Sequence, residues 1–92
     1  MAEPLEQYVF EQFVRNLKRI DFIVDELDLV ETNIATIDQH IEEADRTGLD
    51  EIVEQLSTKR NDLNLKRIDL EIQKNKIERQ LLEFERAQAL SK

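Results

Sequence analysis

Few side chains in this sequence have the chemistry that catalysis requires. His40 is the only histidine, cysteine is absent, and the serines are Ser57 and Ser91. A helical hairpin that turns near Thr47 would bring Ser57 close to His40. A nucleophile also needs a pocket and an oxyanion hole, however, and the sequence carries no signal for either. We therefore predict that the protein is not an enzyme and that His40 is a solvated helix residue.

The acidic segment Asp45–Glu51 surrounds Gly48, the only glycine of the chain. Calcium-binding loops also place acids around a glycine, but this segment is too short for one, and Arg46 interrupts it. A di-iron bundle would need Glu three residues before His40, where the sequence has Ile37. A single glycine also excludes a glycine-rich phosphate-binding loop. These observations predict that the protein holds neither a metal nor a cofactor.

One basic band raises the alternative that the chain is a small dimeric helical regulator that binds RNA or DNA. The band is not interleaved with aromatic residues, and the whole chain has a net charge of −8, which repels nucleic acid. Pairing of these side chains with acids of the same chain is the preferred interpretation. The band consists of Lys59, Arg60, Lys66, Arg67, Lys74, Lys76 and Arg79.

The elements that must position these residues are two long helices. Composition with one glycine, one proline and abundant Glu, Leu, Ile, Lys and Arg is typical of coiled coils. The first helix is predicted at about residues 4–45, with Pro4 in its first turn. Weak helix formers at Thr32–Asn33 raise the alternative of a kink. Two sevenfold apolar series define its seam: Ile20, Leu27, Ile34 and Ile41, and Ile23, Val30, Ile37 and Ala44.

The second helix, predicted at residues 50–90, has one apolar series and one mixed series. The apolar series is Leu49, Leu56, Leu63, Leu70, Ile77 and Phe84. The companion series that we assign to the same seam is Ile52, Lys59, Lys66, Gln73 and Gln80. The seam of this helix is therefore expected to be half polar, with lysine stems covering apolar surface.

A turn at residues 46–49 joins the helices. Gly48 is expected in the left-handed conformation that ends a helix. Thr47 followed by Asp50 resembles a capping box, and Asp50 is also a candidate N-cap. A turn centred on Thr47 places residue i opposite roughly residue 94 − i.

Charge supports the antiparallel arrangement of the two helices. Residues 21–54 contain twelve acids and a single base, Arg46, whereas the basic band lies on the other helix. The predicted register sets these two segments side by side, and it sets Phe10 and Phe13 near Leu81 and Phe84. Exposed ion pairs select an arrangement more than they stabilise it.

Both helices carry apolar residues outside the seam, which predicts a further partner. We expect an all-α, long antiparallel helical hairpin, a two-helix coiled coil, that dimerises into a four-helix bundle. The expected oligomer interface is Phe22, Leu29, Leu65, Ile68, Ile72 and Leu82.

Most of the aromatic residues lie in the first quarter of the chain. Tyr8, Phe10 and Phe13 are candidates either for the core and dimer interface or for docking of another protein. Tyr8 with Phe10 is the better candidate pair for docking, because Phe13 lies in the seam.

A hexapeptide occurs twice: Asn16–Asp21 is identical to Asn64–Asp69. Either one helix was duplicated together with a binding epitope, or a restricted coiled-coil vocabulary produced the match by chance. If the repeat is a duplication, Leu65 and Ile68 correspond to Leu17 and Ile20 and should be buried by some partner.

Taken together, residues 1–92 are predicted to form a single helical-hairpin domain with a homodimeric state and an unidentified protein partner. The predicted function is a non-enzymatic protein–protein interaction module that acts as scaffold, adaptor or inhibitor. We see no signal peptide and no apolar run of the roughly 20 residues that span a bilayer. With cysteine also absent, we expect a cytoplasmic protein without membrane contact.

Overall fold

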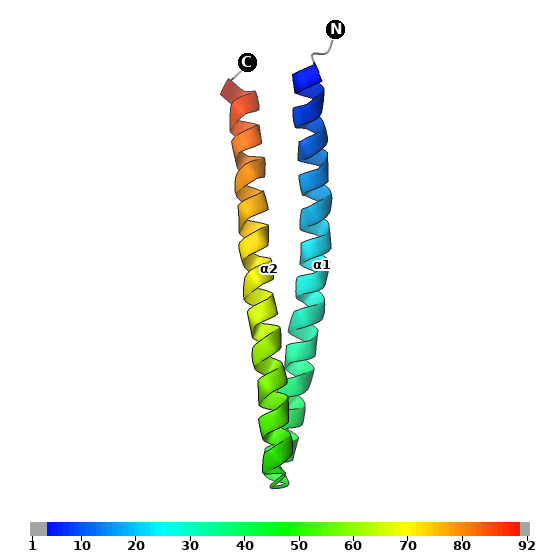
Figure 1. The fold of residues 1–92 in the computed structure, drawn as a ribbon, viewed down its shortest axis with the longest axis vertical. Coiled ribbons are helices and arrows are strands. Elements are labelled where there is room, and N and C mark those ends of the chain that lie inside the picture. Colours follow the sequence, from blue (N-terminus) through cyan, green and yellow to red (C-terminus); the bar gives the residue numbers. More distant parts are fainter. Residues whose placement is uncertain (1–3, 91–92) are drawn as a thin grey trace.

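Two long antiparallel helices make up the structure (Figure 1). The computed structural model describes the backbone of residues 4–90 and the side chains of residues 7–90. Helix α1 spans Pro4–Arg46 and helix α2 spans Asp50–Leu90, so the predicted helix limits are confirmed to within one residue. The hairpin is 70 Å long but only 19 by 14 Å across.

Helix α1 is continuous through Thr32–Asn33, where the sequence raised the alternative of a kink. The hydroxyl groups of Thr32 and Thr36 donate to the carbonyls of Asp28 and Thr32, at 2.9 and 3.0 Å. Each threonine thus satisfies its own hydroxyl within the helix instead of competing for the backbone N–H groups.

The turn is a Schellman motif built on Gly48, which has a φ of 74°. The Gly48 N–H donates to the carbonyl of Asp45, and the Leu49 N–H donates to the carbonyl of Ala44. These two bonds satisfy carbonyls that would otherwise be orphaned at the end of α1. The left-handed conformation predicted for Gly48 is therefore confirmed.

The predicted capping roles of Thr47 and Asp50 are wrong. The Thr47 hydroxyl donates back to the carbonyls of Glu43 and Ala44, both at 3.1 Å, and so completes α1. Leu49 occupies the N-cap position of α2, because its carbonyl accepts the first helical bond, from Val53. Asp50 is instead the first helical residue, where its charge suits the positive end of the helix dipole.

The core is one-sided. Within residues 7–90, seven apolar residues are buried; six of them lie on α1, and Ile77 is the one on α2. Ile23, Leu27 and Ile77 form a cluster, with Ile20, Leu70 and Leu81 partly buried against it. Both predicted apolar series of α1 therefore face α2. The buried residues of α1 are Ile23, Leu27, Val30, Ile34, Ile37 and Ala44.

The predicted companion series of α2 is wrong by one position. Lys59, Lys66 and Gln80 of that series are exposed, and only Gln73 is half-buried. The half-buried residues that alternate with Leu56, Leu63, Leu70, Ile77 and Phe84 are instead Val53, Arg60, Arg67, Lys74 and Leu81. Three basic side chains therefore lie in the seam itself. The predicted companion residues follow the Leu49–Ile77 series by three positions, and the observed ones follow it by four. A heptad seam allows both spacings, so the sequence pattern did not distinguish the two companion series.

The register is close to the predicted one but shifted at the open end of the hairpin. The rings of Phe13 and Phe84 stack with centroids 4.6 Å apart and an interplanar angle of 22°. These two residue numbers sum to three more than the predicted register requires, a shift of almost one helical turn. The expected approach of Phe13 to Phe84 is confirmed, whereas the side chain of Phe10 remains 59% exposed.

Gly48 provides a test of the turn. A Cβ at this position would meet no atom within 4 Å, so the cost of Gly48→Ala comes from the positive φ alone. We expect Gly48→Ala to lower the free energy of unfolding by about 1–2 kcal/mol. Gly48→Asn should cost less, because asparagine tolerates the left-handed region. Urea denaturation measures both; equal stability of all three proteins would contradict the assigned conformation.

Arg67 provides a test of the polar seam. Its Nε atom is buried and has no hydrogen-bond partner among the described residues. Replacing a buried ion pair with well-packed apolar side chains of similar volume is often neutral or stabilising by about 1–4 kcal/mol, because the desolvation cost of the charges is removed. The same cost applies to the buried, unbonded Nε of Arg67. We expect Arg67→Met to raise the free energy of unfolding in urea. Arg79→Met, at an exposed position of the same helix, is the control and should change it by less than about 0.5 kcal/mol.

Candidate interaction surfaces

Thirteen large apolar side chains among residues 7–90 are substantially exposed on the outer surface of the hairpin. All six residues of the predicted oligomer interface are among them, with exposed fractions from 47% for Ile68 to 66% for Leu65. Tyr8 and Phe10 are also exposed, at 58% and 59%. Phe13 is half-buried in its stack with Phe84, and so belongs to the core rather than to a docking surface.

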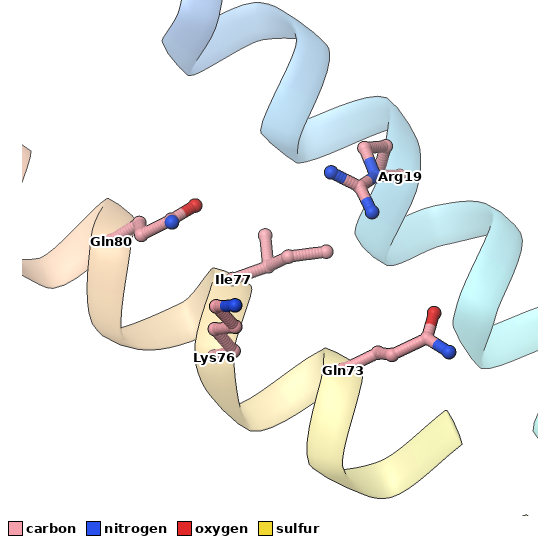
Figure 2. Close-up of a pocket in the computed structure, with 5 residues that line it drawn as sticks. All are labelled: Arg19, Gln73, Lys76, Ile77 and Gln80. Carbon is pink, nitrogen blue, oxygen red and sulfur yellow. The ribbon is translucent and has the colours of Figure 1, made fainter. Parts of the chain in front are cut away.

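On one side of the hairpin, Arg19 and Glu26 of α1 lie next to a row of α2 residues. This row contains Lys66 and Gln73. Lys66 forms an ion pair with Glu26 at 3.8 Å. Arg19, Gln73, Lys76, Ile77 and Gln80 line a shallow pocket of about 230 Å³. In Figure 2, Arg19 is directed from α1 toward Ile77, while Gln73 and Gln80 extend from α2 toward α1.

Charges on this side are balanced, so we call it the neutral face. Phe22 lies on it, because Phe22 lines a second pocket together with Arg19 and Gln73. Leu29 follows seven residues later in the same row of α1. The bases of the neutral face are Arg15, Arg19, Lys59, Lys66 and Lys76, and the acids are Glu26, Glu43, Asp62, Asp69 and Glu83.

The opposite side carries acids and no base among the described residues, so we call it the acidic face. Each helix contributes two sevenfold rows to the acidic face. These rows lie beside the seam, on the side opposite to Arg19 and Gln73. Asp38, in one of these rows, forms an ion pair with Arg60 of the seam. Its acids, all exposed, are Asp21, Asp28, Glu31, Asp38, Glu42, Asp45, Asp50, Glu54, Glu71, Glu78 and Glu85.

The acidic face also carries exposed apolar residues. Phe10, Leu17 and Val24 form one sevenfold row on α1, with exposed fractions of 59%, 43% and 37%. Ile68 and Leu82 lie on the outer part of the same face on α2, at 47% and 52%. Leu17 and Val24 are not among the residues predicted for the interface, although their regular sevenfold spacing after Phe10 is the signal that indicates a shared face.

The six residues predicted to form one oligomer interface therefore do not share a face. Phe22 and Leu29 lie on the neutral face, whereas Ile68 and Leu82 lie on the acidic face. Leu65 and Ile72 are seven residues apart on the back of α2, away from α1. One flat partner surface cannot cover all six, because they surround the hairpin.

The repeated hexapeptide has two different orientations. In α1, Ile20 packs against the core cluster. In α2, the equivalent Ile68 is exposed and the preceding residue, Arg67, lies in the seam. The second copy is thus turned by one residue, about 100° around the helix axis. Leu17 is exposed like its counterpart Leu65, and the expectation that a partner buries Leu65 and Ile68 stays a prediction.

The basic band is largely used within the hairpin. Arg60, Arg67 and Lys74 are half-buried in the seam. Besides the Arg60–Asp38 and Lys66–Glu26 pairs, Lys74 pairs with Glu78 on its own helix, at 3.7 Å. The two pairs between helices confirm the expected match between the acidic segment and the basic band.

The residues considered for catalysis and metal binding are dispersed. His40 is exposed and lines a pocket by the turn with Ala44, Leu49 and Leu56 among others. The hydrogen bonds of the described residues do not link it to Ser57, and Ser91 lies outside the described residues. Within residues 4–90, no three acidic, histidine or cysteine side chains gather as a metal site would require. In the same part of the chain, no helix is long and apolar enough to cross a membrane.

Comparisons with known proteins return no relative: no protein-family model matches the chain, and neither the curated proteins nor the solved structures contain a significant match.

Proposed function

We propose that this chain is a non-enzymatic protein–protein interaction module. In this proposal the hairpin self-associates into a homodimeric four-helix bundle that acts as scaffold, adaptor or inhibitor of a protein partner. The observation that carries the proposal is the exposed area of the hairpin, 7551 Å². A compact monomer of 10.9 kDa is expected to expose only about 5600 Å².

The shape of the hairpin supports the same proposal. Its radius of gyration is 20.4 Å, against about 12 Å for a compact domain of this length. Only seven apolar residues are buried among those whose side chains the structure describes, and small chains with thin cores commonly gain stability by oligomerisation. The excess exposed area is ample for a stable interface, which takes about 800 Å² from each partner.

Within this proposal, the second copy packs on the neutral face. Like charges oppose association, and the neutral face is the one on which acids and bases balance. Phe22 and Leu29 supply its apolar contacts, at exposed fractions of 65% and 56%. Leu65 and Ile72, on the back of α2, lie at the margin that a second hairpin would cover.

The basic band offers less support for the alternative, a regulator that binds RNA or DNA. Of its seven residues, only Lys59, Lys76 and Arg79 are both exposed and outside the ion pairs between described residues. Binding to nucleic acid depends mainly on cations that can neutralise phosphates. Three dispersed cations on a chain with net charge −8 do not make a basic surface.

A matched pair of double variants tests self-association. We expect sedimentation equilibrium to detect a dimer of the wild-type chain at micromolar concentration. Phe22→Gln with Leu29→Gln should raise the dissociation constant about 100-fold, because four apolar side chains per dimer each lose roughly 0.7 kcal/mol of burial. Glutamine is a good helix former, so circular dichroism should show unchanged helicity.

The control is Leu17→Gln with Val24→Gln, which makes the same kind of change on the acidic face. This double variant should keep the dissociation constant of the wild type within about threefold. A wild-type chain that stays monomeric at about 100 μM would reject the dimer. An equal effect of the two double variants would reject the neutral face as its interface.

A further inference from the structure

The acidic face combines two parallel rows of different chemistry. On α1, Phe10, Leu17 and Val24 make an exposed apolar row. On α2, Glu71, Glu78 and Glu85 make an exposed acidic row with the same sevenfold spacing. Each row spans 14 residues, or about 21 Å along its helix.

The two rows lie at the same level of the hairpin. The stack of Phe13 on Phe84 fixes the level, since Phe10 is three residues from the first ring and Glu85 is adjacent to the second. Both rows flank the seam, so they border the strip of surface along which α1 meets α2 on the acidic face, and we call this strip the groove. Lys74 pairs with Glu78 along α2 at 3.7 Å, and both groups remain partly exposed.

The charge of this groove limits what can occupy it. A second copy packed on the same face would bring the eleven exposed carboxylates of one chain against the eleven of the other, which costs free energy. The neutral face of a second copy has no net positive charge to offer. Nucleic acids and anionic lipid surfaces are repelled by the same carboxylates.

We propose that the groove of the acidic face binds a basic amphipathic α-helix of a partner protein, with Leu and similar residues against Leu17 and Val24 and with Lys or Arg against Glu71, Glu78 and Glu85. The bound helix forms a three-helix arrangement with α1 and α2 in the half of the hairpin that is remote from the turn. It takes about three heptads, or about 21 residues, to cover both rows. This inference rests on the proposed function and names the chemistry of the partner and the place where it binds.

A designed peptide serves as the probe. It has about 21 residues in three identical heptads, with Leu at positions a and d, Lys at e and g, and a fluorescent label at its N-terminus. A second peptide has Glu in place of every Lys. Fluorescence anisotropy with the full-length chain at about 150 mM salt should show at least about tenfold tighter binding of the Lys peptide than of the Glu peptide.

Two triple variants locate the site. Glu71→Lys, Glu78→Lys and Glu85→Lys together should weaken binding of the Lys peptide at least about tenfold and strengthen binding of the Glu peptide. Asp62→Lys, Asp69→Lys and Glu83→Lys make the same change in net charge on the neutral face and should alter affinity less than about threefold. Leu17→Gln with Val24→Gln should weaken binding of the Lys peptide without changing net charge.

Several outcomes overturn the inference. Equal weakening by the two triple variants would mean that total charge attracts the peptide, not this groove. Undetectable binding of the Lys peptide at about 100 μM wild-type chain would also overturn it. Sedimentation of the same samples separates the two proposals. A dimer that ignores the Lys peptide rejects the groove and retains self-association, whereas a monomer that binds the peptide at this groove rejects self-association and retains the groove.

Discussion

The structure depends on how the apolar seam of α1 is covered by a seam of α2 that is basic at alternate layers. Leu63, Leu70 and Ile77 supply apolar layers, while Arg67 and Lys74 fill the layers between them with long stems. Such stems cover apolar surface and carry their charges toward the rim. This explains why, among the described side chains, α1 contributes six of the buried residues and α2 contributes Ile77.

Placing bases in the seam also determines the outer surface. Several bases of α2 are not free on the outer surface, where they could balance the acids of α1. Arg67 and Lys74 lie between the helices, and Arg60 and Lys66 pair with Asp38 and Glu26 of α1. One side of the hairpin consequently has exposed acids and no base among the described residues. Long-range electrostatic attraction at that side favours cationic partners. On the other side acids and bases are equal in number, so two copies of the chain can contact each other there without net charge repulsion.

The repeated hexapeptide illustrates how tertiary packing overrides local identity. The same six residues form a helix in both places, as their propensities require. Ile20 enters the core in α1, whereas in α2 the seam selects Arg67 and leaves Ile68 outside. The orientation of a helix about its own axis is a property of its whole contact surface, so a short identical segment does not determine which residue faces inward.

The sequence by itself determined what depends on local chemistry: two long helices, their ends near Pro4, Arg46 and Asp50, the left-handed Gly48, and antiparallel pairing of an acidic with a basic segment. Heptad spacing also identified the seam of α1 in full, because both of its series are apolar. Only the tertiary structure decided the companion series of α2, the register marked by Phe13 and Phe84, and the division of the exposed apolar residues between two faces. The physical reason is that offsets of three and four residues fit a heptad equally well. The packing of the complete helices selects the rotation of α2, and that rotation decides which side chains remain for a partner.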